Sequence, residues 1–339
     1  MADPSPAEPS SAGAPRADAP KSAGTFSLEG RPAAGLYLVG WLLSGLGLGL
    51  LFIAIQVAPP AGGLLLMTAL LSVAVGFAAS AGYQVIARAS RPASAFRSAS
   101  PAIVLALQLV LSLVLGTVWV VLGVPDPRES APGFLVISLT LLASYMFVVW
   151  LFGVRTGAMR WRDMGVPVLS GRLAWAQIGR DVGFGGITML IMWPLVTFLA
   201  GLLALGLGTR TADVVPDPVS SIDVLLTALG AGLFVPIGEE VFFRGYALTA
   251  WLRDRGARSA LIRSTLFFAF AHVLGVTATT FDQGWRQALL TVVVITPVGA
   301  ALGWLFLRRG LFCSIAGHAT FNLVSVLAVT VAQSLPRPV

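Results

Sequence analysis

Long stretches of apolar residues, separated by short polar segments, are the dominant pattern along this chain of 339 residues. Most stretches are about 20 residues long, which is the length that an α-helix needs to cross the hydrocarbon core of a bilayer. Their apolar residues are continuous and do not alternate with polar ones, which excludes the strand pattern of an outer-membrane barrel. The pattern predicts nine membrane-spanning helices, with eight as the close alternative, over residues 35–57, 62–87, 102–124, 133–153, 182–207, 222–252, 264–279, 287–307 and 311–333.

The composition agrees with a protein that lies mostly in lipid. Hydrophobic residues make up 56% of the chain and charged residues 11%, and the mean hydropathy is +0.86. Because lipid offers no hydrogen-bond partner to the backbone, we predict an all-α polytopic membrane bundle. Residues 1–30 are rich in Ala, Pro and Ser and are predicted to form a disordered tail. Residues 31–210 hold predicted spans without a recognisable motif, whereas residues 215–335 hold the unusual polar side chains.

Arginines gather in alternate connections between the predicted spans. The basic connections are residues 88–97, 155–180, 253–263 and 308–309, together with the N-terminal tail. By the positive-inside rule these segments and the N-terminus face the cytoplasm, and with nine spans the C-terminus lies outside. The net charge of +7 is therefore mainly a signal of topology. No recognisable nucleic-acid-binding module accompanies the dispersed arginines, so nucleic acid is not a predicted partner.

Six polar side chains lie inside the predicted spans of the last third of the chain: Glu239, Glu240, Arg244, both histidines of the protein, His272 and His318, and its one asparagine, Asn322. A membrane interior selects against such groups, so their collection predicts a functional site. Glu240 and Arg244 are four residues apart and share a helix face. His318 and Asn322 have the same spacing. Glu239 is turned by about 100° from Glu240 and is free to face another group.

The positions of these groups along their helices predict that they meet. His272 lies nine residues beyond Arg263, and His318 lies nine beyond Arg309, so each is ~13.5 Å from the predicted cytoplasmic edge. Glu239 lies twelve residues before Trp251, which is near the end of the same predicted span, and this separation is ~18 Å along a helix. All three are therefore expected near the middle of the membrane, in a site that opens toward the cytoplasm.

Three interpretations of these groups remain open from the residues alone. In the first, they form a buried polar clasp that stabilises the bundle. In the second, they form a hydrolytic or ligand-binding site. In such a site a carboxylate and an imidazole hold a water molecule, while a second imidazole and an amide stabilise an oxyanion or complete a metal shell. One Glu–Arg pair would suffice for a clasp, which favours the second interpretation. A proton-coupled transporter ranks third, because no inverted repeat is evident.

Three short motifs follow one another on successive predicted helices: Glu239-Glu240-x-x-x-Arg244, Phe268-x-x-x-His272 and His318-x-x-x-Asn322. In this order and spacing they resemble the motifs of the CAAX prenyl protease type 2 and bacteriocin-processing family of intramembrane proteases, also called the abortive-infection family. The resemblance covers roughly residues 220–330. Residues before 210 contribute helices to it but no motif.

The resemblance implies a glutamate-type or metal-dependent endopeptidase that acts within or at the membrane, with residues 215–335 as its catalytic membrane domain. Glu239 would then be the general base that activates water, helped by His272. His318 and Asn322 would stabilise the tetrahedral oxyanion.

The resemblance also assigns the remaining pair and a conditional metal. Glu240 and Arg244 would organise the site, with the arginine neutralising the second carboxylate. If zinc is bound, Glu239, His272 and His318 would supply the three protein ligands of an open catalytic site. A metal-free arrangement of glutamate, histidine and water uses the same residues, so zinc stays a conditional expectation.

The expected substrate is a membrane-associated or lipidated protein or peptide, cleaved from the cytoplasmic side of the bilayer. The abundance of Ala, Pro and Arg suggests a GC-rich bacterial genome, and the predicted location is the plasma membrane of a bacterium. In that setting peptide maturation, bacteriocin immunity or regulation of another membrane protein is favoured over CAAX processing. The alternative from another class is a non-hydrolytic scaffold or immunity protein that keeps the polar cluster.

Overall fold

The fold was analysed in a computed structural model, which describes residues 27–54, 56–57, 61–167, 171–209, 215–216, 220–276, 278 and 280–334. All but the last four residues of the predicted tail, 1–30, lie outside these described residues. Every regular element in the described part of the chain is helical, which confirms the predicted all-α class.

Within the described ranges, eight helical stretches are long and apolar enough to cross a membrane. They are α1 (Ala34–Ala54), α2 (Ala61–Arg88), α3 (Pro101–Val121), α4 (Ala131–Val149) with its π-helical extension η1 (Trp150–Val154), α5 (Gly171–Leu207), the continuous segment Ser221–Arg255, α10 (Phe281–Arg309) and α11 (Leu311–Ser334). Helix α9 (Ala257–Val273), at 17 residues, overlaps the seventh predicted span, 264–279, and falls just short of that length. A polytopic helical bundle is thus confirmed, with eight long spans in place of nine.

The helix that carries His272 differs most from its predicted bounds. The prediction placed a span over 264–279, whereas α9 begins seven residues earlier and ends at Val273. Gly275 and several threonines follow, and these residue types favour turns over helix. Thr280 then caps the next helix, its hydroxyl accepting a hydrogen bond from the backbone N–H of Gln283 at 3.2 Å. The pattern of apolar residues alone does not show where α9 ends and where the next helix begins.

The segment Ser221–Arg255 is one long helix in which the winding changes four times. It consists of α6 (Ser221–Leu229), the π-helix η3 (Gly230–Phe234), α7 (Val235–Glu240), the π-helix η4 (Val241–Leu248) and α8 (Thr249–Arg255). Pro236 has no N–H to donate to the preceding turn, and the π-helix η3 comes immediately before α7. Turns of π-helix are often found at functional sites, and here they flank the two glutamates on both sides.

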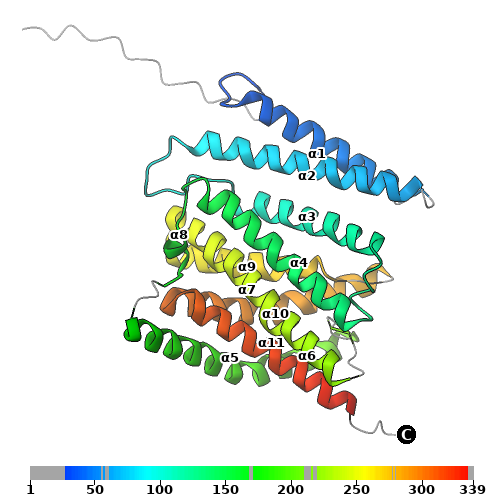
Figure 1. Cartoon of the computed structure of the whole chain (residues 1–339), viewed down its shortest axis with the longest axis vertical. Coiled ribbons are helices and arrows are strands. Elements are labelled where there is room, and N and C mark those ends of the chain that lie inside the picture. Colours follow the sequence, from blue (N-terminus) through cyan, green and yellow to red (C-terminus); the bar gives the residue numbers. More distant parts are fainter. Residues whose placement is uncertain are drawn as a thin grey trace, which may run out of the picture.

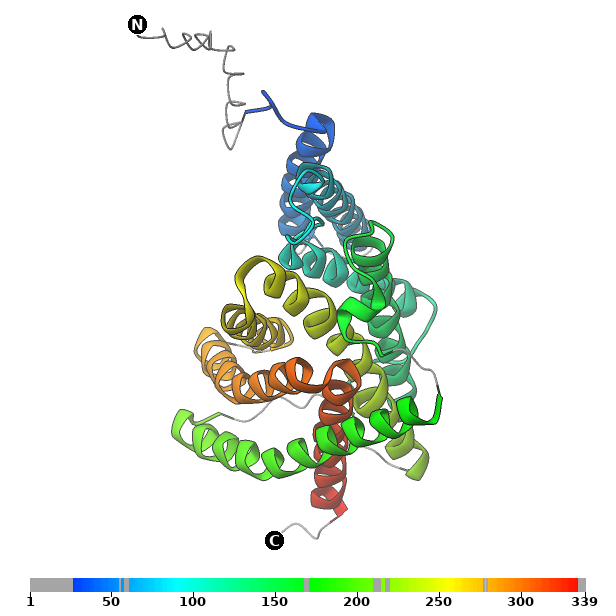
Figure 2. The same cartoon turned by 90° about the vertical axis from the view of Figure 1, so that its left-hand side faces the viewer.

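The helices form layers, with the N-terminal pair farthest from the C-terminal end. Helices α1 and α2 lie together at one end of the molecule, α3 and α4 come next, and α5 and α11 lie at the other end (Figures 1 and 2). The segment Ser221–Arg255 and helices α9 and α10 lie between these groups. The candidate site residues are therefore carried by the central and C-terminal helices.

Two single-residue connections turn the chain sharply in this region. Gly256 joins α8 to α9 with φ of 77°, and Gly310 joins α10 to α11 with φ of 83°. Other residues rarely adopt this left-handed conformation, so glycine permits a corner without a loop. The turn at Gly310 sends α11 away from α10 at a steep angle (Figure 2).

A cluster of buried aromatic rings fixes the central helix against its neighbours. Phe243 packs edge-on to Phe268 of α9, with ring centroids 5.0 Å apart, and Tyr145 of α4 lies 5.4 Å from Phe242. Such ring pairs combine a large buried apolar area with a preferred orientation. The cluster follows directly after the glutamates in the chain, so it fixes their helix in position.

Candidate active site

Glu239 and Glu240 occupy the last turn of α7 and face different surroundings. The Glu240 side chain is fully buried, whereas that of Glu239 is 15% exposed. Consecutive residues on a helix point about 100° apart, which is why one carboxylate can enter the packed core while the other borders an accessible space.

Glu240 is the centre of a buried polar network. One of its oxygens, Oε1, accepts hydrogen bonds from Arg244 Nη1 at 2.7 Å and from His318 Nδ1 at 2.9 Å. Its other oxygen, Oε2, contacts the hydroxyl of Ser314. The pair predicted at i, i+4 is therefore present, and both oxygens of Glu240 are occupied by protein groups.

Arg244 connects this network to two further helices. Its Nη2 donates to the backbone carbonyl of Gly299 in α10 at 3.3 Å, and its guanidinium lies 4.1 Å from the ring centroid of Phe268 in α9. A buried charge is tolerated where a counter-ion, hydrogen bonds and an aromatic face replace its hydration. Arg244 thus holds three helices together around Glu240.

Hydrogen bonds at the Nδ1 atoms determine which form each histidine presents to the site. His272 Nδ1 lies 2.8 Å from the carbonyl oxygen of Phe268, which can only accept, so Nδ1 carries the proton. His318 Nδ1 likewise donates to the Glu240 carboxylate. In a neutral imidazole the other nitrogen is then an unprotonated acceptor. Both Nε2 atoms therefore present lone pairs.

These two lone pairs and a carboxylate oxygen face one another. Glu239 Oε2 lies 3.9 Å from His272 Nε2 and 3.8 Å from His318 Nε2. The same oxygen is buried and has no hydrogen-bond partner among the described residues. A buried oxygen without a partner is costly. The three atoms form an acceptor-only cluster, which requires a proton, a water molecule or a cation to complete it.

The donor set and its surroundings suit zinc in chemistry, while the spacing is slightly too wide. Zinc-bound histidines usually donate their second N–H to a carboxylate or a carbonyl, as both histidines do here. Zinc bonds of about 2.0–2.2 Å would place two ligand atoms of a tetrahedral site roughly 3.3–3.5 Å apart. The observed separations are a few tenths of an ångström longer, and within the described ranges no group of three or more His, Cys, Asp or Glu has a metal-binding arrangement.

Asn322 lies one turn beyond His318 on α11, as its spacing predicted, and its amide is engaged elsewhere. Nδ2 donates to the backbone carbonyl of Ala231 in η3 at 2.8 Å. This contact joins α11 to the π-helical turn that precedes the glutamates. The role that the resemblance implied for Asn322, stabilisation of an oxyanion, stays a prediction.

Sequence reasoning did not identify Ser314 as part of the site. Its hydroxyl contacts both Glu240 Oε2 and, at 3.0 Å, the carbonyl oxygen of Leu302 in α10. A signal was available, because Ser314 precedes His318 by four residues and so shares its helix face. Serine is common in membrane helices, however, and only the position of Glu240 in space distinguishes this one.

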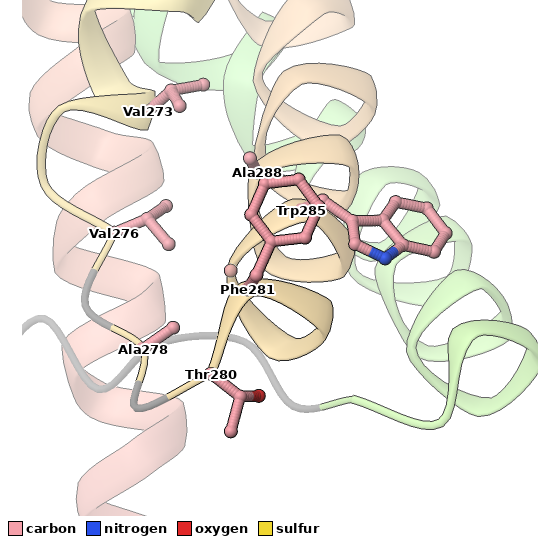
Figure 3. A pocket seen from close by; sticks show the side chains of 8 residues that line it. Val273, Val276, Ala278, Thr280, Phe281, Trp285 and Ala288 are labelled. Atoms are coloured by element: carbon pink, nitrogen blue, oxygen red, sulfur yellow. The ribbon is translucent and has the colours of Figure 1, made fainter.

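An open pocket of about 560 Å³ lies where α9 gives way to α10, one residue beyond His272 (Figure 3). Its lining side chains are apolar except for that of Thr280, with Val273 and Val276 on one side and Phe281, Trp285 and Ala288 on the other. An apolar pocket of this kind can accommodate either the acyl chains of surrounding lipid or an apolar substrate. The pocket therefore adds an apolar surface beside the polar cluster without defining a ligand.

One of three comparisons with known proteins found a match. Residues 221–324 match the family described as type II CAAX prenyl endopeptidase Rce1-like. No curated protein and no solved structure matches the chain. The matched segment begins with α6, contains all six polar residues of the site, and excludes α1 to α5. The match confirms the resemblance predicted from the three motifs and supports endopeptidase activity at the level of the family.

Proposed function

We propose that this protein, which resembles the Rce1-like type II CAAX prenyl endopeptidases over residues 221–324, hydrolyses a peptide bond of a membrane-associated or lipidated polypeptide. The observation that carries the proposal is the acceptor-only cluster formed by Glu239 Oε2 and the Nε2 atoms of His272 and His318. A water molecule can donate its two hydrogens to such a cluster. Its oxygen is then left free to attack a carbonyl carbon.

In the first step Glu239 takes a proton from the water as general base, and the water oxygen bonds to the scissile carbonyl carbon. His272 accepts the second hydrogen of the water and orients it. The carbonyl oxygen acquires negative charge in the tetrahedral intermediate. His318, whose imidazole Glu240 orients through Nδ1, is the residue that the resemblance assigns to stabilise this charge.

In the second step the proton held by Glu239 passes to the amide nitrogen, the carbon–nitrogen bond breaks, and a carboxylic acid and an amine leave. The acid then loses its proton to water. Glu240 and Arg244 take no proton in this sequence. They fix the orientation of His318 and compensate charge, which is the organising role that the resemblance implied.

If zinc is bound, Glu239, His272 and His318 are the residues that would hold it, and the ion would lower the pKa of a bound water and polarise the carbonyl. The hydrogen bonds at the Nδ1 atoms of the two histidines leave both Nε2 atoms free, and this suits a zinc-bound site as well as a metal-free one. Metal analysis of the purified, active protein distinguishes the two.

The proposal extends to the setting of the reaction. The basic connections support an N-terminus and an active-site opening on the cytoplasmic side, and the composition supports the plasma membrane of a bacterium. The resemblance supports a lipidated or membrane-associated peptide as substrate, with the apolar pocket beside His272 available to its apolar part.

The proposal is tested with the Glu239→Gln variant, which keeps the size and one acceptor of the side chain but cannot take up a proton. The expected result is a loss of cleavage by a factor of at least 100, the low end for removal of a general base. The measurement uses an internally quenched peptide that ends in a farnesylated CAAX sequence, in proteoliposomes. Mapping of new peptide ends in membranes that contain the protein provides a second readout, which does not presuppose the substrate.

Cleavage by Glu239→Gln at the wild-type rate, for a peptide that the wild type cleaves, or identical peptide ends in both membranes, would contradict the proposal. The alternative function, a scaffold or immunity protein, has support of its own, because Glu240, Arg244, Ser314 and His318 form a self-contained polar clasp. That alternative predicts that Glu239→Gln leaves the cellular phenotype unchanged at normal protein abundance. The hydrolytic proposal predicts that the phenotype is lost.

A further inference from the structure

The backbone carbonyl of Ala231 is left without its usual hydrogen-bond donor by the winding of its own helix. Ala231 belongs to the π-helix η3, in which the N–H of Val235 donates to the carbonyl of Gly230. In the same winding the carbonyl of Ala231 would accept from the residue five positions later, which is Pro236 and has no N–H. Ala231 is buried, and a carbonyl without a donor is costly in a membrane helix. The carbonyl therefore needs a donor from another part of the chain.

Asn322 of α11 supplies this donor. Its Nδ2 donates to the carbonyl oxygen of Ala231 at 2.8 Å. Helix α11 comes close to η3 at this point because Gly232 has no side chain, and a Cβ added there would clash with the side chain of Leu323. The amide of Asn322 thus replaces the hydrogen bond that Pro236 removes from the helix.

The same face of α11 contacts the segment Ser221–Arg255 a second time, at the glutamates. One turn before Asn322, Nδ1 of His318 donates to Glu240 at 2.9 Å. Ala231 lies eight residues before Glu239, which is about two helical turns. Two contacts on one side of a helix fix its rotation about its axis more firmly than one. The direction of the Glu239 side chain therefore depends on the contact that Asn322 makes.

We propose that Asn322 is a positioning residue, which holds η3 and α7 through the carbonyl of Ala231 and so points Glu239 toward the two histidines. The role differs from the one that the resemblance implied, in which Asn322 donates to the oxyanion of the substrate. The effect on cleavage rests on the proposed hydrolytic function, whereas the effect on the helix does not. The amide makes and breaks no covalent bond.

The first test is Asn322→Ala, which leaves the carbonyl of Ala231 without a donor. The melting temperature should fall, and amide hydrogen exchange in peptides that cover residues 230–240 should become faster in the absence of substrate. For a peptide that the wild type cleaves, kcat per folded molecule should fall by about 100-fold, a loss that a small misplacement of a catalytic group can cause. The KM should stay near the wild-type value, because Glu239 acts in the chemical step. A residue that donates only to the oxyanion would leave the exchange unchanged.

The second test is suppression by Pro236→Ala, which returns an N–H to the helix at the position that can donate to Ala231. The double variant Asn322→Ala, Pro236→Ala should regain a kcat and a melting temperature close to those of Pro236→Ala alone. Pro194→Ala is the matched control, since it also removes a proline from within a helix, in α5, but supplies no donor to Ala231. It should not restore the activity of Asn322→Ala.

A wild-type kcat in Asn322→Ala overturns the inference, even where Glu239→Gln is inactive and the proposed function stands. Recovery of the melting temperature without recovery of kcat in the double variant also overturns it, because the amide then acts on the substrate. If Pro236→Ala is itself impaired, hydrogen exchange decides: unchanged exchange over residues 230–240 in Asn322→Ala overturns the inference, and faster exchange supports it. Wild-type cleavage by Glu239→Gln removes the proposed function itself and leaves the exchange result in place.

Discussion

At the scale of single residues, the division of labour between two adjacent carboxylates is the central feature of this protein. Glu240 is fully buried and accepts from Arg244 and His318, whereas Glu239 keeps an oxygen without a partner. Breaking a buried ion pair leaves an uncompensated charge in a medium of low dielectric constant. The paired carboxylate therefore serves stability, and the unpaired one is available for chemistry.

Glu240→Gln should lower the free energy of unfolding by about 3 kcal/mol, because Arg244 would be left buried without its counter-ion. Asp282→Asn is the matched control, since Asp282 and Arg286 form an ion pair of the same i, i+4 spacing with side chains that are 64% and 37% exposed. For that exposed pair the expected loss is below about 0.5 kcal/mol. Unfolding of both variants in mixed micelles gives the comparison. Equal losses would show that the burial of Glu240 has no energetic consequence.

At the scale of elements, two glycine corners determine how the site is assembled. Glu239 lies 17 residues before Gly256 and His272 lies 16 after it, so the two arms of this corner bring the residues to one level. Gly310 places His318 eight residues into α11. Because neither corner contains a flexible loop, the positions of the two histidines depend on the backbone angles of single residues.

Alanine at either corner should destabilise the fold, because a side chain at positive φ costs roughly 1–2 kcal/mol. A Cβ at Gly256 would meet no atom within 4 Å, whereas one at Gly310 would lie 3.1 Å from the carbonyl oxygen of Gly165. Gly310→Ala should therefore have the larger effect on the melting temperature. Gly179→Ala in α5, where a Cβ also meets open space in an ordinary helical conformation, should be neutral or stabilising. The prediction fails if all three variants melt alike.

At the scale of the whole molecule, polar contacts among the arginine-rich connections join the N-terminal half to the segment that matches the family, residues 221–324. Asp254 accepts from the backbone N–H of Phe96 at 3.0 Å and pairs with Arg91 at 3.3 Å. Arg253 pairs with Asp163 at 3.2 Å. These contacts hold two connecting loops against the end of α8. They stabilise the arrangement in which α4 packs against α7, the helix that carries the glutamates.

The contribution of Asp163 should depend on pH. Partial burial raises the pKa of its carboxyl, but hydrogen bonds from Arg160 and the charges of Arg160 and Arg253 outweigh this, so the pKa lies below its usual value. A lowered folded-state pKa gives stability that is present above the unfolded value of about 3.9 and is lost as the pH falls through the folded value. Asp163→Asn should therefore melt below wild type at neutral pH, and the difference should vanish in strong acid. A difference that is constant down to about pH 3 would contradict this account.

Much of the site followed from the sequence because its members are rare in membrane helices. Glu239, His272 and His318 were predicted to share a level, and the structure places both imidazoles within 3.9 Å of the Glu239 carboxylate. Ser314 could not be identified in this way. Serine is unremarkable in a membrane helix, and the importance of Ser314 arises from its contact with Glu240, 74 residues away in the chain. The bounds of α9 were displaced because glycine and threonine end a helix within a stretch that is still apolar.

The sequence by itself determined the class of the fold, the approximate positions of the spans and six polar residues as candidates for a site, because the cost of polar groups in lipid acts on each residue separately. Only the tertiary structure decided which oxygen of which glutamate lacks a partner, which nitrogen of each histidine faces it, and which N-terminal helix lies alongside. Those features depend on the crossing of helices and on the direction of single hydrogen bonds. Neither is encoded in the local pattern of apolar and polar positions.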